Sequence, residues 1–118
     1  MSAKRQAAFE ELKREVGDYK GEIGNIHKII ERYQEKVKKF PASHKVHDEM
    51  AKLEAMSGSL LKETIAADKL LAEIEMTLDN QSETKRKVKE LYSLLDDSFK
   101  LLAGAEVLER EISDVLSV

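Results

Sequence analysis

The amino-acid sequence predicts an all-α fold, an elongated antiparallel three-helix bundle that runs up, down and up and packs like a coiled coil. Apolar residues recur at steps of three and four along almost the whole chain, and only two short segments interrupt the pattern. The composition agrees, because 42% hydrophobic and 36% charged residues with one proline and five glycines are typical of long helices. We expect one domain over residues 1–118, since this length supports a single core.

The first helix is predicted over about residues 3–40. Strand alternation would scatter its apolar residues over two faces, so only a helix keeps them on one stripe. Pro41 should end it, because proline lacks the N–H donor and disfavours helical geometry in the residue before it. Ser43 is expected to cap the next helix. The stripe consists of Phe9, Leu12, Val16, Tyr19, Ile23, Ile26, Ile30, Tyr33, Val37 and Phe40.

The second helix is predicted over about residues 44–79 and the third over about 82–117. A short turn, Asp79-Asn80-Gln81-Ser82, separates them, and Ser82 is the expected cap of the third helix. Both stripes are wide, which favours a closed bundle over an open helical hairpin that dimerises. The third stripe includes Leu91, Leu94, Ser98, Leu101, Ala105, Leu108, Ile112 and Val115, with Val88, Leu95, Phe99 and Leu102 alongside.

Short connections force each helix to return against the one before it, which allows the register to be estimated. Turns centred near residues 42 and 81 make facing residue numbers add up to about 84 and then about 162. Thr64 then lies opposite Ser98, with Tyr19 at the same level. We interpret these three as a candidate polar core layer whose hydrogen bonds fix the register, or else as small residues tolerated by chance. Helices of this length predict a rod about 54 Å long.

Three glycines mark the first candidate partner-binding surface. Gly17, Gly21 and Gly24 stand at i, i+4 and i+7, on the outward face of the first helix. Each costs up to about 1 kcal/mol relative to alanine inside a helix. The stripe is interpreted as a groove for another helix or as a hinge, and the alternative is a tolerated weak spot.

A basic cluster marks the second candidate partner-binding surface. Lys85, Arg86, Lys87 and Lys89 crowd the start of the third helix, where the helix dipole favours negative charge. The cluster would suit an acidic partner, or it is a solvated mixed-charge end. Nucleic acid is disfavoured as a partner, because no aromatic residues interleave with the basic ones and nearby acids cancel much of the field.

The residues that could carry chemistry do not form a catalytic pattern. The chain has no cysteine, so it has no disulfide, thiol nucleophile or zinc thiolate site. His44 and His47 stand three apart, but a metal site needs three or four converging ligands. No glycine-rich phosphate loop and no nucleophile–base–orienter arrangement occurs. We therefore expect no enzyme activity, no metal and no cofactor.

Resemblances to known families concern architecture. In size and three-helix rhythm the chain resembles a spectrin-type repeat, although it lacks the tryptophan typical of that family's first helix. The acidic end of the predicted second helix, followed by the stretch from Thr84 to Val88, resembles part of the co-chaperone BAG domain, but the spacing from Val88 to Asp96-Asp97 is too short for a clean match and no residue role is carried over.

Together these features predict a non-enzymatic protein–protein interaction module, an adaptor or co-chaperone-like bundle whose partners are other proteins. The alternative is a structural or assembly subunit, a rod-like spacer that forms homo-oligomers through its heptad seams. No apolar run approaches the roughly 18 residues that span a bilayer, and the N-terminus lacks the apolar stretch of a signal peptide. With no cysteine, the chain fits a reducing compartment, and we expect it to be cytoplasmic.

Overall fold

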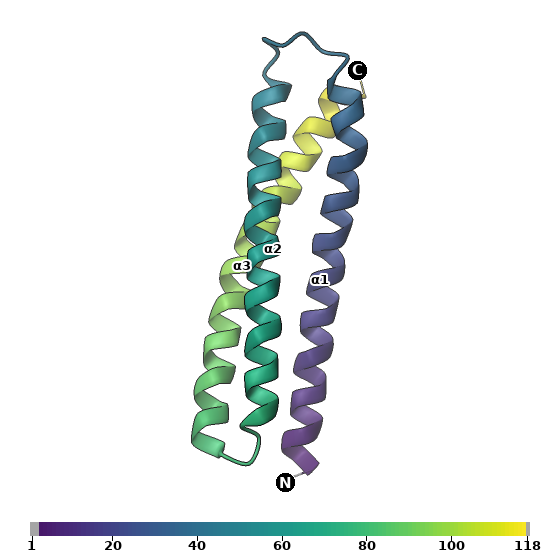
Figure 1. Cartoon of the computed structure of the whole chain (residues 1–118). Helices are drawn as coiled ribbons and strands as arrows, with labels where there is room; N and C mark the ends of the chain where they lie inside the picture. The colour runs from purple at the N-terminus through teal and green to yellow at the C-terminus, as the bar shows by residue number, and fades with distance from the viewer. Residues whose placement is uncertain (1–2, 118) are drawn as a thin grey trace.

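The computed structural model describes residues 3–117. It contains three helices, α1 (Ala3–Val37), α2 (Val46–Met76) and α3 (Gln81–Leu116), and no strand within the described range. The helices run up, down and up, so the start of α1 lies at the same end as the α2–α3 turn (Figure 1). The Cα atoms extend 60 Å along the rod and 18 and 17 Å across it. The predicted elongated all-α three-helix bundle is confirmed.

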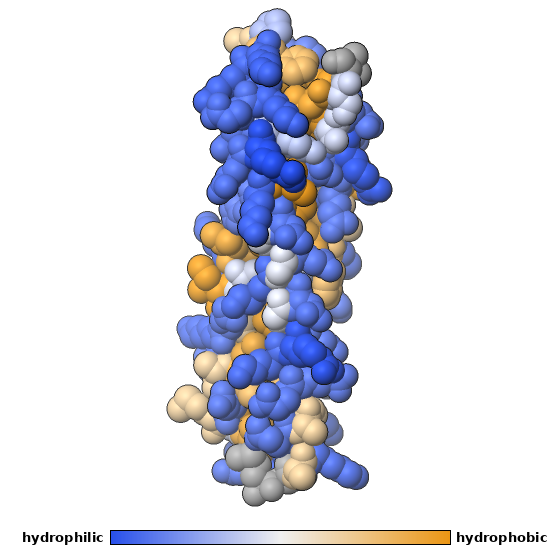
Figure 2. All heavy atoms as spheres, turned by 90° about the vertical axis from the view of Figure 1, so that its right-hand side faces the viewer, coloured by the Kyte–Doolittle hydropathy of each residue, from blue (hydrophilic) through white to orange (hydrophobic). Residues whose placement is uncertain are grey.

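The apolar stripe of α1 forms one side of the core. All of its predicted members are buried except Tyr33 and Phe40, which are partly buried and pack against the core. In the space-filling view of the side that carries α1, hydrophilic atoms cover most of the surface and hydrophobic atoms emerge in a few places (Figure 2). The stripe is thus turned inward, where its burial stabilises the bundle.

The three helices do not pack equally. α2 lies between the other two and contacts both extensively, whereas α1 and α3 approach each other least. In Figure 1, α3 crosses behind α2, and its C-terminal end reaches the end of α1. There the Tyr33 hydroxyl donates a hydrogen bond of 2.6 Å to the Glu109 carboxylate. Apart from this contact, the seam between α1 and α3 is the most open of the three, because these two helices approach each other least.

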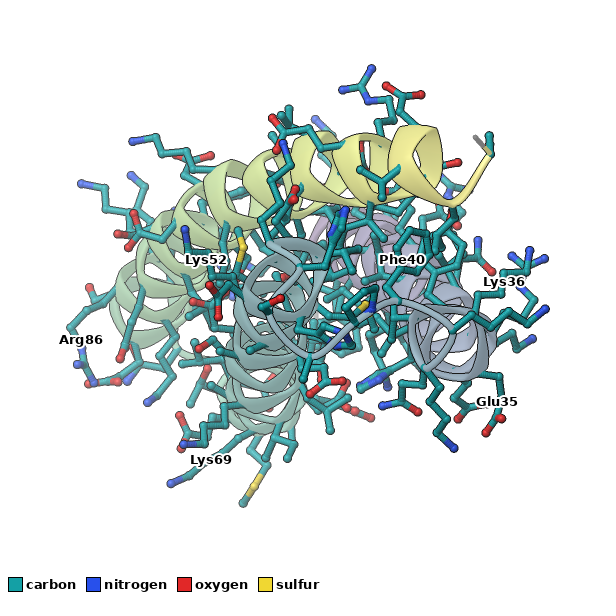
Figure 3. All side chains as sticks on the ribbon, turned by 90° about the horizontal axis from the view of Figure 1, so that it is seen from above. Glu35, Lys36, Phe40, Lys52, Lys69 and Arg86 are labelled. Carbon is teal, nitrogen blue, oxygen red and sulfur yellow. The ribbon has the colours of Figure 1, made fainter. Side chains whose placement is uncertain are left out.

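The connection between α1 and α2 is longer than the sequence predicts. α1 ends at Val37, and Phe40 lies in the connection with its side chain packed against the core, while Glu35 and Lys36 point outward (Figure 3). The predicted cap Ser43 is wrong, because Lys45 occupies the N-cap position and makes no side-chain cap hydrogen bond. Pro41 has no N–H to donate to the Val37 carbonyl and its ring would clash with that carbonyl, so the helix ends four residues before the proline, and the Phe40 N–H bonds to Val37 instead at 3.1 Å.

The cap predicted for α3 is also wrong. The Asn80 side chain, not that of Ser82, accepts a hydrogen bond of 3.2 Å from the Glu83 backbone N–H. Because α2 already ends at Met76, the turn closes earlier than expected and the extended residue before the helix is Asn80. Ser82 lies exposed in the first turn of α3.

Cross-helix contacts lie within about one helical turn of the estimated register, the largest departures being Lys20 with Asp68 and Gln34 with Glu54. Ser57 lies against His27, with 3.2 Å between its hydroxyl and the ring Nδ1, at the level that the estimate gives. On the other side of α2, Glu73 lies 3.0 Å from the Lys87 ammonium, two residues from the estimated position. Short antiparallel connections leave little freedom for the helices to slide.

Candidate functional site

The glycine stripe lies on open surface. Gly17 and Gly21 are exposed and Gly24 is partly buried. A Cβ atom added at any of the three would have no atom within 4 Å, apart from chain neighbours and the helix's own backbone. No other helix of this chain uses the stripe, so its role as a docking groove or hinge stays a prediction.

The basic cluster is partly neutralised by acids of the same chain. The Lys87 side chain is 18% exposed and its ammonium contacts the Glu73 carboxylate across the α2–α3 seam. This hydrogen bond holds the pKa of Glu73 below its usual value. The Arg86 guanidinium lies 2.7 Å from Glu83 in the same helix, and this hydrogen bond raises the pKa of Arg86. Two of the four predicted binding cations therefore already have acidic partners.

The two remaining cations of the cluster are exposed. Lys85 lines a surface hollow together with Arg5, as the antiparallel fold predicts, and Lys89 faces solvent one turn further on. Arg5 also donates a hydrogen bond of 2.9 Å to the Leu78 carbonyl, which holds the start of α1 against the end of α2. This end of the rod carries mixed charge, and its role in binding an acidic partner stays a prediction.

The three residues of the candidate polar layer are all buried, and Tyr19 and Ser98 both lie close to Glu63. The Ser98 hydroxyl donates to the Glu63 carboxylate. The Thr64 hydroxyl donates to the Leu61 carbonyl of its own helix at 2.6 Å. The Tyr19 hydroxyl lies near Ser98 and the Glu63 carboxylate but makes no hydrogen bond of normal geometry, and burial raises the pKa of Tyr19. The three hydroxyls do not bond to one another, and an effect on the register stays a prediction.

The open seam between α1 and α3 forms a groove of about 400 Å³ with an aromatic floor. Tyr19 and Leu95 are buried, whereas Tyr92 and Phe99 expose 47% and 48% of their surface. The Tyr19 and Phe99 rings meet edge to face, with their centroids 5.2 Å apart. The weak approach of α1 and α3 thus leaves two large rings half uncovered.

Every charged residue that lines this groove is acidic. They are Glu15, Asp18 and Glu22 from α1 and Asp96 from α3. Partial burial, followed by the carboxylates of Glu15 and Glu11, raises the pKa of Tyr92. The groove lined by these four acids and by Tyr19, Tyr92, Leu95 and Phe99 is called the acidic groove below.

A smaller apolar cavity of about 150 Å³ continues the acidic groove toward the end of the rod. Tyr92 lines both, and all three helices contribute walls. This end cavity is lined by Arg5, Ala8, Phe9, Leu12, Ile74, Leu78, Thr84, Val88 and Tyr92.

Sequence reasoning missed the acidic groove, although its parts are visible in the sequence. Tyr92 and Phe99 stand seven residues apart, and Glu15, Asp18 and Glu22 stand at i, i+3 and i+7, so each set shares one helix face. The spacing places Phe99 on the flank of the apolar stripe. Its half exposure depends on how closely α1 approaches α3, which the periodicity of one helix does not specify.

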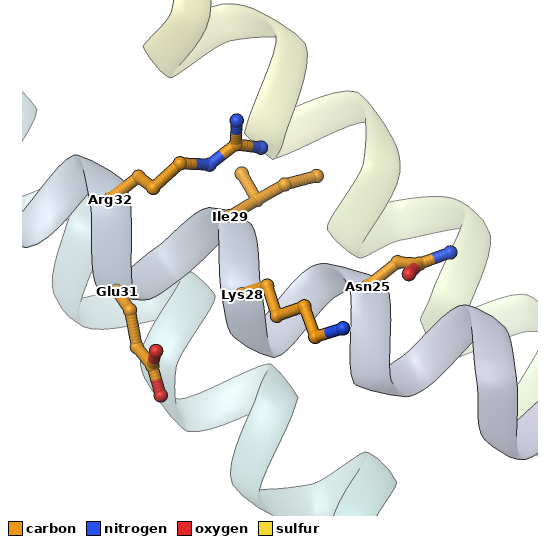
Figure 4. Close-up of a pocket in the computed structure, with 5 residues that line it drawn as sticks. All are labelled: Asn25, Lys28, Ile29, Glu31 and Arg32. Carbon is orange, nitrogen blue, oxygen red and sulfur yellow. The ribbon is translucent and has the colours of Figure 1, made fainter.

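A hollow of about 750 Å³ lies on the outer surface of α1 alone. In Figure 4, Ile29 and Arg32 point to the side on which α3 passes, whereas Glu31 points to the other side. No second helix supplies a wall, so this hollow offers a ligand less enclosure than the acidic groove. Its lining residues are Asn25, Lys28, Ile29, Glu31 and Arg32.

The two histidines near the start of α2 hold the connection between α1 and α2. The His44 Nδ1 accepts a hydrogen bond of 3.0 Å from the Val46 N–H, and its ring packs on Phe40. The His47 Nε2 lies 3.2 Å from the Phe40 carbonyl oxygen and donates to it. Within residues 3–117, no group of three or more His, Asp or Glu side chains is placed to hold a metal ion.

No helix in the described part of the chain combines the length and the apolar character needed to cross a membrane. Comparisons with known proteins find no match among family models, curated proteins or solved structures.

Proposed function

We propose that this chain is a non-enzymatic protein-binding module, an adaptor or co-chaperone-like bundle that presents a helix face to partner proteins. The observation that carries the proposal is the acidic groove, where Tyr92 and Phe99 are half exposed beside four acidic side chains. Aromatic side chains supply much of the binding energy at protein interfaces, and exposed apolar patches mark interaction sites.

Two further features support a binding role. The glycine stripe leaves α1 free of side chains along one face, where another helix could approach closely. The exposed cations Lys85 and Lys89 offer a weaker contact for an acidic surface. The absence of cysteine fits work in the reducing cytoplasm, which is part of the proposal.

The second candidate function is assembly into a larger rod or oligomer. Leu61 and Ile65 stand four residues apart on α2 and expose 44% and 66% of their surface, while Met76 exposes 87%. Two copies that met along this flank would bury these side chains in a symmetric contact.

The two functions differ in sedimentation and in capture of partners. We would compare the wild-type chain with Tyr92→Ser/Phe99→Ser and with the matched control Leu61→Ser/Ile65→Ser. A binding module is expected to sediment as a monomer at every concentration, and its captured proteins should be lost only with the first variant. A mass that grows with concentration, and that falls to the monomer with the control variant, would establish assembly and reject the module.

A further inference from the structure

We propose that the acidic groove and the end cavity together bind a basic amphipathic helix of a partner protein. This inference rests on the proposed binding function and specifies the chemistry of the partner. The groove and cavity supply the two complementary surfaces that such a helix requires, one apolar and one negatively charged.

The apolar face of the partner has a defined place to enter. The end cavity of about 150 Å³ is walled mostly by apolar side chains, and a dry apolar cavity of about this size can hold a benzene ring. Tyr92 lines both the cavity and the groove, and Phe99 follows two helical turns further on. An apolar side chain in the cavity and others over Phe99 would match the i, i+3/i+4, i+7 anchors of a helix in a groove.

The charge of the partner is inferred from the four acidic residues that line the acidic groove. Glu15, Asp18, Glu22 and Asp96 make no ion pair with any residue that the structure describes. Elsewhere the chain pairs acids across its seams, as Lys20 with Asp68 at 2.8 Å and Lys87 with Glu73 at 3.0 Å. Four unpaired carboxylates beside half-exposed rings create a negative field that favours lysine and arginine on a bound segment.

The spacing sets the length of the partner helix and the end at which its apolar anchor lies. From Phe9 in the end cavity to Glu22 at the far edge of the groove, α1 rises about 20 Å. A helix of about 14 residues covers this distance. Its apolar anchor would lie toward the end of the rod, where Arg5 borders the cavity, and its basic residues toward the middle.

The experiment uses a displayed library of 15-residue helices as the probe. Leucine is fixed at one amphipathic stripe, and every other position varies among Lys, Arg, Glu, Asp, Gln and Ser. After selection on the full chain, we expect enrichment of Lys and Arg. Selected helices should lose about tenfold in affinity for Glu15→Lys/Asp18→Lys and for Phe99→Ser, and binding should weaken with added salt. The matched charge-reversal control Glu111→Lys/Asp114→Lys, at the other end of the rod, should stay within about twofold.

Circular dichroism melting of each variant shows that it is folded, so a loss of affinity reports on the groove. Selected helices that are neutral or acidic, a library that yields no binder, or equal binding to the groove and control variants would overturn the inference. The proposed function is tested separately. If no basic helix binds but Tyr92→Ser/Phe99→Ser still abolishes capture of a partner, the function stands and only the partner's chemistry is rejected.

Discussion

The ring of Tyr19 on α1 meets the ring of Phe99 on α3 edge to face, with a centroid distance of 5.2 Å and an angle of 72° between the planes. This contact joins the two helices that otherwise approach each other least. Tyr19 is buried whereas Phe99 is half exposed, so one aromatic pair serves both the core and the floor of the acidic groove. Stability and binding are therefore coupled at this pair, and a change at either ring has to be tested for both.

The buried hydroxyl of Tyr19 should make stability depend on alkaline pH. Burial raises the pKa of Tyr19 above its ordinary value of 10.0, so the folded state holds the proton more tightly than the unfolded state. This contribution to stability is present below pH 10.0 and is lost as the pH rises through the raised value. Tyr19→Phe should flatten the decline of urea-unfolding free energy above pH 10.0 relative to wild type. An unchanged slope would contradict the prediction.

The same substitution should not weaken the bundle at neutral pH. The Tyr19 hydroxyl is buried without a partner, and an unsatisfied buried polar group costs about 1–3 kcal/mol. Tyr19→Phe is expected to keep or raise the free energy of unfolding, whereas Tyr19→Ala should lower it by about 3–5 kcal/mol through the cavity that it leaves. Urea titrations at pH 7 measure both, and a large loss in Tyr19→Phe would show that the hydroxyl is bonded.

Alanine in the glycine stripe should stabilise the chain. A Cβ at Gly17 or Gly21 meets no atom within 4 Å, so each substitution should add up to about 1 kcal/mol of helix stability. Gly104→Ala is the control, because its Cβ would lie 3.0 Å from the Met56 Cε and that side chain would have to move. Thermal unfolding compares the three variants. A decrease in stability at Gly17 or Gly21 would show that the stripe is constrained in the folded chain.

Asn80 and Ser82 are two neighbouring polar residues at the start of α3, and only Asn80 caps the helix. Asn80→Ala should lower the free energy of unfolding by about 1 kcal/mol, because it removes the acceptor for the Glu83 N–H. Ser82→Ala, its control inside the first turn, should cause little change. The reverse order of effects in chemical denaturation would place the cap at Ser82, as the sequence alone predicts.

The hydrogen bond from Ser98 to Glu63 can be measured with a double-mutant cycle. Ser98 is fully buried, and its hydroxyl donates to a carboxylate of the neighbouring helix. Ser98→Ala should cost about 1–2 kcal/mol in the wild-type background and clearly less beside Glu63→Ala, which has no acceptor for the hydroxyl. The control is Ser93→Ala, an exposed serine on the same helix with the same change in helix propensity. Additive effects at positions 63 and 98 would contradict the coupling.

Periodicity and the short connections sufficed to predict the core and, to within about one helical turn, the register. The α1 stripe from Phe9 to Val37 is buried as its spacing predicts, except that Tyr33 is only partly buried. Ser57 also lies against His27 at the estimated level. Both results follow from local rules, because apolar spacing fixes the inward face of a helix and short returns fix how helices face each other.

The caps and the acidic groove were not predictable in the same way. Competition among polar residues decides a cap, and the structure starts α2 after Lys45 and α3 after Asn80 rather than after Ser43 and Ser82. The groove depends on the crossing of α3 behind α2, which leaves Phe99 half exposed beside Glu15 and Asp18.

Apolar periodicity is a property of one helix at a time, so it was enough to predict a three-helix rod and the inward face of each helix. Where the rod is open depends on how the helices pack against one another. The gap between α1 and α3 depends on the distance and angle between helices far apart in sequence, and these are set by the packing of the whole core. Along this gap, Tyr92, Phe99 and the neighbouring carboxylates line one continuous groove.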